Sequence, residues 1–188
     1  MPFNDLREFI GFLESKGELI RTKKPVDVKY EISAYIRKTS DVQGPALLFD
    51  NVKEFTIPVL GGAFATRKRA LLALETSNED YVNKFHDALD HLVAPKLTAN
   101  APCKDVIIKG QDVDLNKLPV PIFSERDPAP FITLGLCISR DPKSGGKNTS
   151  IYRLQLKGRN RLGIMKPRPK AFSLPALPKS TSMSPPVK

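Results

Sequence analysis

The residues that could do chemistry in this chain form none of the common short catalytic motifs. A Walker loop, a Gly-x-Ser-x-Gly elbow, a His-Glu-x-x-His zinc helix and a Gly-x-Gly-x-x-Gly loop after a strand are all absent from the sequence. The two histidines, His86 and His91, stand five residues apart on a predicted helix, and we expect each to be solvated or packed on that helix. Cys103 and Cys137 lack paired spacing, which argues against zinc binding and a disulfide, so we predict two reduced, buried thiols.

One basic cluster and one predicted strand hold the other polar candidates. The basic cluster 67–69 (Arg-Lys-Arg) could hold an anion, although we expect the more common solvated helix start. Asn148 follows a Gly-Gly-Lys turn, as the residue leaving any hairpin could, and Arg153 stands on an alternating strand, where arginine usually faces solvent. By themselves, these residue types do not define a site.

Helices and strands are predicted to alternate over the first hundred residues. Asn4 or Asp5 can cap a first helix, whose apolar residues recur at helical spacing until Gly17, a favourable residue just past a helix end. Predicted helices span 6–16, 29–39, 66–74 and 78–92, and predicted strands span 18–21, 46–49 and 57–62. This alternation favours an α/β domain over residues 1–100.

The second half of the chain is predicted to be β-structure. Two β-rich runs, 131–139 and 149–157, flank a turn at 141–147 that contains a proline and two glycines, which is the pattern of a hairpin that begins a sheet or barrel. No helix is signalled between residues 101 and 165. Residues 166–188 hold six prolines and no periodicity, so we predict a disordered tail.

Several linked blocks of sequence carry a family resemblance. In the second half they are 131–136 (Phe-Ile-Thr-Leu-Gly-Leu), 139–142 (Ser-Arg-Asp-Pro), 148–153 (Asn-Thr-Ser-Ile-Tyr-Arg) and 158–163 (Gly-Arg-Asn-Arg-Leu-Gly). In the first half they are 5–10, 17–19, 44–49 and 58–61. Together these blocks resemble the UbiD family of decarboxylases. The resemblance runs from residue 3 to residue 165, and it is specific because several blocks occur in the right order.

The resemblance implies a fold and an activity. It implies a mixed α/β (α+β) chain, with an N-terminal α/β domain over 1–100, the opening strands of a split β-barrel flavin-binding domain over 101–165, and a separate tail over 166–188. The implied activity is that of a carboxy-lyase that removes carbon dioxide, reversibly and without oxidation, from aromatic or α,β-unsaturated acids. Members of the family use prenylated FMN as the electron sink.

The resemblance also implies the site residues. The family's Asn-x-x-Ile-x-Arg stretch matches Asn148, Ile151 and Arg153. It implies that Asn148 binds a divalent metal that bridges to the cofactor phosphate, with Mn²⁺ as the expected ion and K⁺ as a further candidate. Ile151, Tyr152 and Arg153 would lie against the flavin, and Arg153 would also be the catalytic arginine. An amide oxygen suits a hard cation, and a guanidinium can clamp a carboxylate.

Charge is distributed unevenly along the chain. The formal net charge of +10 comes from the last quarter, because 11 of the 30 basic residues and no acidic residue follow Asp141, so residues 1–141 carry a net charge of −1. In the family, the acidic partners of the catalytic arginine and a carboxylate ligand of the metal come from later in the chain. We therefore expect a truncated chain that is inactive alone and has no downstream carboxylate for Arg153.

Three functions are open at this point. The first is a UbiD-type decarboxylase that acts on a small carboxylic acid and is homo-oligomeric in its full-length form. The second is a non-catalytic subunit or assembly piece of a split decarboxylase. A nucleic-acid binder is the weakest, because Phe172 is the only aromatic residue of the basic tail and the body has no helix-turn-helix or RNP-like motif. With neither a signal peptide nor an apolar membrane span in the sequence, we expect a cytoplasmic protein.

Overall fold

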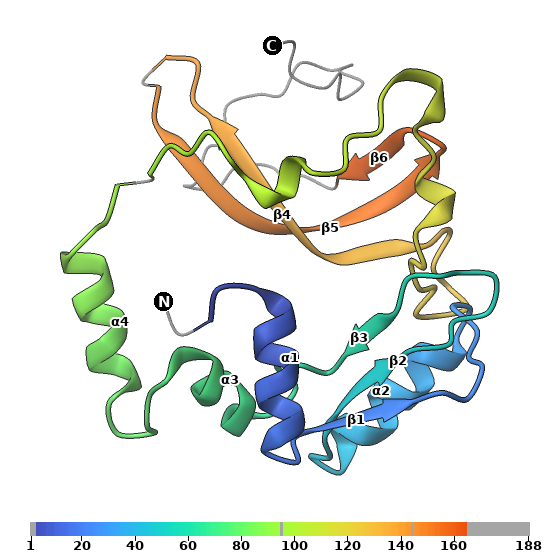
Figure 1. Ribbon diagram of the computed structural model, residues 1–188, viewed down its shortest axis with the longest axis horizontal. Helices are drawn as coiled ribbons and strands as arrows, with labels where there is room; N and C mark the ends of the chain where they lie inside the picture. The colour runs from blue at the N-terminus through green and yellow to red at the C-terminus, as the bar shows by residue number, and fades with distance from the viewer. Residues whose placement is uncertain (1–2, 95, 144, 165–188) are drawn as a thin grey trace. The chain divides into compact units, whose positions relative to one another are not determined.

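The computed structural model describes residues 3–94, 96–143 and 145–164, which form two compact units (Figure 1). The described residues up to 27 and from 31 to 107 form the first unit, and residues 28–30 with those from 108 onward form the second. The tail predicted to be disordered, 166–188, lies outside the described residues. As predicted, the chain combines helices with small sheets.

The first unit is built on a three-stranded sheet of order β1-β2-β3. β1 (Leu19–Thr22) runs parallel to the central β2 (Ala46–Phe49), and β3 (Val59–Gly61) runs antiparallel to it. All four side chains of β2 are buried, as expected of a central strand that is covered on both faces. The three strands predicted from the apolar runs are therefore confirmed.

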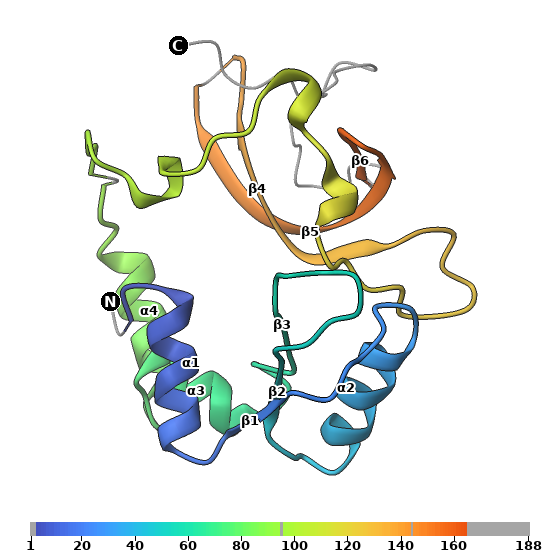
Figure 2. The ribbon, with the colours of Figure 1, turned by 45° about the vertical axis from the view of Figure 1, so that its right-hand side comes forward.

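Helices cover both faces of this sheet (Figure 2). α1 (Leu6–Ser15) and α3 (Arg67–Leu74) lie on one side, and α2 (Glu31–Asp41) lies on the other. α4 (Tyr81–Asp90) follows α3 and ends two residues earlier than predicted. The core that joins α1 to the sheet consists of Phe9, Leu13, Leu19, Ala46 and Leu48.

Local contacts explain how these helices begin and pack. The Asp5 carboxylate accepts a hydrogen bond from the backbone N–H of Glu8 at 2.9 Å, which confirms the predicted cap of α1. On the other face, α2 packs closely against the end of β3. A Cβ atom on Gly61 would lie 2.5 Å from two side-chain carbons of Ile36, so only glycine fits at this contact.

Arg69 corrects the prediction of a solvated basic cluster. The first two residues of the cluster are exposed, but Arg69 is only 1% exposed. Its guanidinium donates hydrogen bonds to the carbonyl oxygens of Gly44 at 2.9 Å and Gly62 at 3.2 Å, and to the Glu18 carboxylate at 3.2 Å. A buried cation needs such partners, and these three residues lie directly beside the strands of the sheet. Arg69 therefore links the ends of β1, β2 and β3.

The second unit contains a three-stranded antiparallel sheet. β4 (Phe131–Arg140) pairs with β5 (Lys147–Gly158), which pairs with β6 (Arg161–Ile164). The β4–β5 hairpin confirms the prediction. β6 was not predicted, because residues 161–164 (Arg-Leu-Gly-Ile) hold only two apolar side chains with a glycine between them. The sheet agrees with the opening strands that the family resemblance implies.

The described residues from 101 to the start of β4 form no α-helix, as predicted, but they contain three short 3-10 helices. These are η1 (Pro102–Lys104), η2 (Gly110–Asp112) and η3 (Leu115–Lys117). Backbone hydrogen bonds tie the segment to the sheet. The N–H of Leu115 donates to the carbonyl of Arg159 at 2.7 Å, and the N–H of Phe131 donates to the carbonyl of Pro121 at 3.2 Å.

The thiols and the histidines also test the sequence predictions. The prediction of two buried thiols was wrong, because Cys103 is exposed in a 3-10 turn and Cys137 is half-buried. His86 and His91 are exposed, as expected, and His91 Nδ1 lies 3.0 Å from an Asp87 carboxylate oxygen. Among the described residues, the structure has no helix that is both long enough and apolar enough to cross a membrane.

Candidate functional site

The predicted site residues lie on β5, and this strand places them on two faces. Side chains alternate between the two faces of a sheet, and the pairing of β5 with β4 is regular over residues 147–152. Asn148 and Tyr152 therefore point to one face, and Ile151 and Arg153 point to the other. Asn148 and Arg153 are also five residues apart, which is roughly 17 Å in an extended strand.

One face of the hairpin is apolar and exposed. We call it the open face and define it as Leu136, Ile138, Thr149, Ile151 and Arg153. Leu136 lies directly opposite Ile151, and Ile138 lies opposite Thr149. The three aliphatic side chains are each more than half exposed. Adjacent exposed apolar side chains of this kind mark a surface that binds a ligand or another surface.

Asn148 belongs to a small polar group at the hairpin end of the other face. It is exposed, and its Nδ2 donates a hydrogen bond to Ser150 Oγ at 3.1 Å. Directly opposite on β4 lies Ser139, whose Oγ is buried and has no hydrogen-bond partner in the part of the chain that the structure describes. This end of the strand therefore offers one amide and two hydroxyl oxygens.

Arg153 is held from two directions. Its Nη2 donates to both carboxylate oxygens of Asp127, each at 2.8 Å. Its guanidinium carbon also lies 3.8 Å from the centre of the Phe131 ring, which is a close cation–π contact. The Arg153 side chain is 47% exposed, whereas that of Asp127 is only 13% exposed. Arg153 is thus accessible to a ligand although its guanidinium is fixed in place.

Asp127 is itself fixed by a tight turn that precedes β4. Its backbone N–H donates to the carbonyl of Ser124 at 3.0 Å, and its carboxylate accepts a hydrogen bond from the backbone N–H of Ser124 at 3.2 Å. The Ser124 hydroxyl in turn accepts from the N–H of Arg126 at 3.2 Å. These bonds fix the position of the Asp127 carboxylate independently of its contact with Arg153.

A β-bulge lies opposite Arg153. The register between β4 and β5 shifts between Ile132 and Gly135, so β4 carries one extra residue there. On the near side of the bulge, Phe131 pairs with Gln155, which places its ring diagonally across from Arg153 on the same face. Bulges often re-aim side chains beside active sites, and this one adjoins the fixed arginine.

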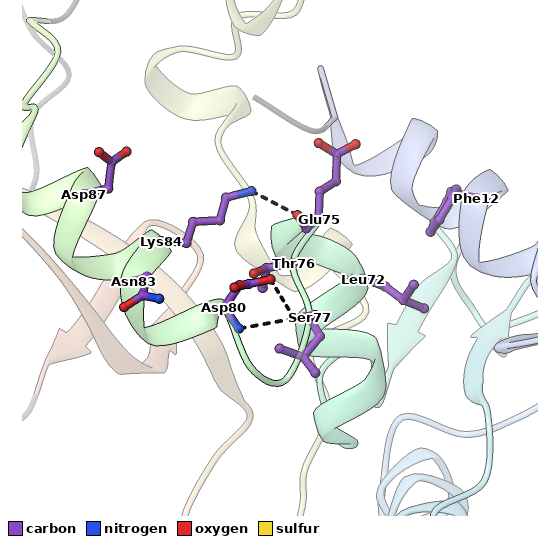
Figure 3. Close-up of a pocket in the computed structure, with 10 residues that line it drawn as sticks. Phe12, Leu72, Glu75, Thr76, Ser77, Asp80, Asn83, Lys84 and Asp87 are labelled. Carbon is purple, nitrogen blue, oxygen red and sulfur yellow. Dashed lines mark hydrogen bonds between the residues drawn. The ribbon is translucent and has the colours of Figure 1, made fainter.

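A separate groove of about 690 Å³ lies in the first unit, between α1, α3 and α4 (Figure 3). Phe12 and Leu72 form its apolar side. On the α4 side, Lys84 Nζ donates to the carbonyl of Glu75 at 3.1 Å, and Asp80 accepts from the Ser77 hydroxyl at 3.0 Å. The groove holds none of the predicted site residues, so we assign no function to it.

Two domain models of one enzyme family match the chain in succession. The model of the 3-octaprenyl-4-hydroxybenzoate carboxy-lyase N-terminal domain matches residues 10–89, and the model of its Rift-related domain matches residues 96–174. The chain belongs to the UbiD family of carboxy-lyases. The second match extends past residue 165, where the resemblance read from the sequence ended.

Solved structures of UbiD-class enzymes resemble this chain. HmfF from Pelotomaculum thermopropionicum in complex with FMN matches with a TM-score of 0.81 and 38% identity, over 87% of this chain and 37% of HmfF. An evolved dimeric form of HmfF in complex with prFMN matches with a TM-score of 0.82 and 37% identity, over 88% of this chain and 39% of that chain. The vanillic acid decarboxylase of Sedimentibacter hydroxybenzoicus matches with a TM-score of 0.79 and 29% identity, over 86% of this chain and 37% of that chain. The chain therefore spans less than two fifths of the length of these relatives.

Asp127 is the site residue that the sequence did not reveal. The family resemblance implied carboxylate partners for Arg153 from later in the chain, and no acidic residue follows Asp141 in this sequence. The structure shows a different partner, Asp127, which lies 26 residues upstream. No local pattern signals the pair, because the turn at Asp127 reaches Arg153 only through the pairing of β4 with β5.

The open face fits a flavin better than the Asn148 group fits a metal. A flat apolar surface beside a guanidinium suits an aromatic ring system that carries an anionic group. Hard cations take about six or more oxygen ligands, usually including carboxylates. No three His, Cys, Asp or Glu side chains are grouped to bind a metal in the described residues. A metal at Asn148 therefore requires ligands from elsewhere.

Proposed function

We propose that this chain provides one wall of the active site of a UbiD-type decarboxylase. Such an enzyme removes carbon dioxide reversibly from an aromatic or α,β-unsaturated carboxylic acid. The observation that carries the proposal is Arg153, which is held by Asp127 beside the apolar side chains of the open face. Membership of the UbiD family supports it, as do the FMN and prFMN of the HmfF structures.

Each residue of the open face has a role in this proposal. Prenylated FMN, when bound, would supply an electron sink for the carbon that loses carbon dioxide. Ile151 and Leu136 would contact the flat ring and exclude water from it. Arg153 would attract the substrate carboxylate through charge-assisted hydrogen bonds. Arg153 is therefore the proposed catalytic residue.

The residues of the other face have more limited roles. Tyr152 is half-buried and its side chain points away from Ile151, so its backbone is the part that can meet the same ligand. Asn148 would give one oxygen to a divalent cation, with Mn²⁺ as the proposed ion, and other parts of the site would complete the shell. Binding of K⁺ stays a prediction.

Flavin retention by the purified chain tests the proposal. The chain is purified from cells that co-express a flavin prenyltransferase, and its flavin absorbance is recorded with and without Mn²⁺. We expect bound flavin in the wild type, less in Arg153→Ala and Ile151→Asp, and loss of the Mn²⁺-dependent part in Asn148→Ala. Arg161→Ala on β6 is the matched control and should retain flavin. If the wild-type chain carries no flavin even with Mn²⁺, the proposed cofactor role is wrong.

A second candidate function is that of a non-catalytic subunit or assembly piece of a split decarboxylase. It is favoured by the exposed apolar side chains of the open face. In that case a second chain should co-purify and contribute carboxylates to the site. A homo-oligomer is the corresponding proposal for the decarboxylase, and the mass of the purified particle distinguishes the two.

A further inference from the structure

We propose that Asp127 is the residue that positions Arg153 at this site, assisted by the ring of Phe131. The inference rests on the proposed function in one respect only, namely that Arg153 faces the ligand. No downstream carboxylate is needed for this role, because the partner lies in the turn before β4. Asp127 acts through Arg153 and does not itself contact the reacting atoms.

The difference in burial shows which partner holds the other. An exposed arginine has many rotamers, and holding one of them costs entropy. Asp127 is 13% exposed on the side chain and is fixed by two hydrogen bonds with Ser124, whereas Arg153 is 47% exposed. The partly buried, pre-placed carboxylate therefore selects one conformation of the more exposed guanidinium.

The geometry of the pair also determines which N–H groups remain for a ligand. Both bonds to Asp127 come from Nη2. Within the part of the chain that the structure describes, no hydrogen bond is made by Nε or Nη1 of Arg153. Each of these two nitrogens shares one edge of the guanidinium with Nη2, and the two edges are different, so an anion can take the N–H of one nitrogen while Asp127 stays bound to Nη2.

Phe131 and the bulge complete the arrangement. The ring centre lies 3.8 Å from the guanidinium carbon, a close cation–π contact that adds a second restraint on the side chain. The extra residue in β4 lies opposite Arg153, where a regular ladder would place a cross-strand neighbour. Three local features, the turn, the ring and the bulge, therefore converge on one side chain.

A first experiment measures the mobility of Arg153 directly in the full chain. Hydrogen exchange of the Arg153 guanidinium is followed by NMR in the wild type, Asp127→Asn, Asp127→Glu and Asp114→Asn. Asp114 is the matched control, because it pairs with Arg159 in the same unit at 3.6 Å. We expect Arg153 to exchange about tenfold faster in Asp127→Asn, the loss expected when a charge-assisted hydrogen bond is removed, with partial rescue by Asp127→Glu and no change in Asp114→Asn.

A second experiment asks whether this positioning matters for a ligand. FMN affinity is measured by fluorescence quenching in Asp127→Asn, Arg153→Ala and the double variant. We expect each single change to weaken FMN binding about tenfold, and the double variant to be no weaker than Arg153→Ala, because Asp127 acts through Arg153. A purely structural role for Asp127 would also lower the melting temperature of Asp127→Asn. In that case, however, the losses of FMN affinity in Asp127→Asn and Arg153→Ala would add up in the double variant.

The outcomes separate the inference from the proposed function. If the wild-type chain binds no FMN while Arg153 still loses protection in Asp127→Asn, the cofactor role fails and the positioning stands. If Arg153 exchanges in the wild type as freely as in Asp127→Asn, the positioning is wrong whatever the flavin result. Additive losses of FMN affinity would overturn it as well.

Discussion

Arg69 shows how one residue can hold together segments that are far apart in sequence. It reaches Glu18, 51 residues away, and Gly44, 25 residues away, from a side chain that is only 1% exposed. We expect Arg69→Met to lower the free energy of unfolding by about 3 kcal/mol, because it leaves carbonyl groups and a carboxylate without their donor. Urea denaturation measures this. Arg67→Met, an exposed neighbour, is the control and should cost less than about 1 kcal/mol.

Glu18 makes the stability of the first unit depend on pH. A hydrogen bond from Lys68 and the contact with Arg69 lower the pKa of the Glu18 carboxyl, although partial burial acts in the opposite direction. Because the pKa is lower in the folded state, the unfolded state binds the proton more tightly. The stabilisation is therefore full above the unfolded pKa of about 4.3 and is lost as the pH falls through the lower, folded value.

The corresponding measurement is a series of urea midpoints between neutral pH and acid. The wild type should lose stability as the pH falls below the ordinary glutamate range. Glu18→Gln should be less stable than the wild type at neutral pH and should lose less on acidification. An equally steep pH dependence in Glu18→Gln would show that other carboxyl groups are responsible.

At the level of elements, the sequence predicted the helices and strands that local sequence patterns identify. The helical spacing and the Asp5 cap identified α1, and alternation identified the β4–β5 hairpin. The same rules missed β6, whose two apolar residues are separated by a glycine, and the Arg153–Asp127 pair, which depends on a turn and a strand 26 residues apart. Residues that act across such distances are visible only when the register of the strands is known.

The close approach of β5 to β4 makes Gly135 a sensitive position in the hairpin. A Cβ atom there would lie 2.6 Å from a Leu154 side-chain carbon and 2.8 Å from the carbonyl oxygen of Tyr152. Because the backbone oxygen cannot move aside, we expect Gly135→Ala to destabilise the β4–β5 pairing by about 2 kcal/mol.

Amide hydrogen exchange along β4 and β5 checks this expectation. Gly163→Ala is the control in the same sheet, since a Cβ there would first meet the flexible side chain of Lys157 at 3.1 Å. Its effect on exchange should be smaller. Equal protection in Gly135→Ala and the wild type would mean that the two strands accommodate the added methyl group without losing stability.

At the scale of the whole molecule, the two units differ in how much core they contain. Of the twelve buried apolar residues among those that the structure describes, ten lie in the first unit and only Val120 and Leu156 lie in the second. A sheet with so few buried side chains gains little from the hydrophobic effect. We expect the second unit to be the less protected of the two against hydrogen exchange in this chain.

The open face gives the second unit a further property, which is a tendency to self-associate. Leu136, Ile138 and Ile151 expose adjacent apolar surface, and burying it against a second copy would be favourable. We expect the chain to form dimers or larger species at micromolar concentration, and the double change Leu136→Thr and Ile138→Thr to shift it toward monomer. Sedimentation velocity measures the distribution. Val42→Thr, at an isolated exposed position of the first unit, is the control and should change nothing.

A wild-type chain that is a stable monomer, with amides protected through β4, β5 and β6, would contradict the expected self-association. If FMN covers the same face, adding it should also reduce association, and Arg153→Ala should weaken that effect.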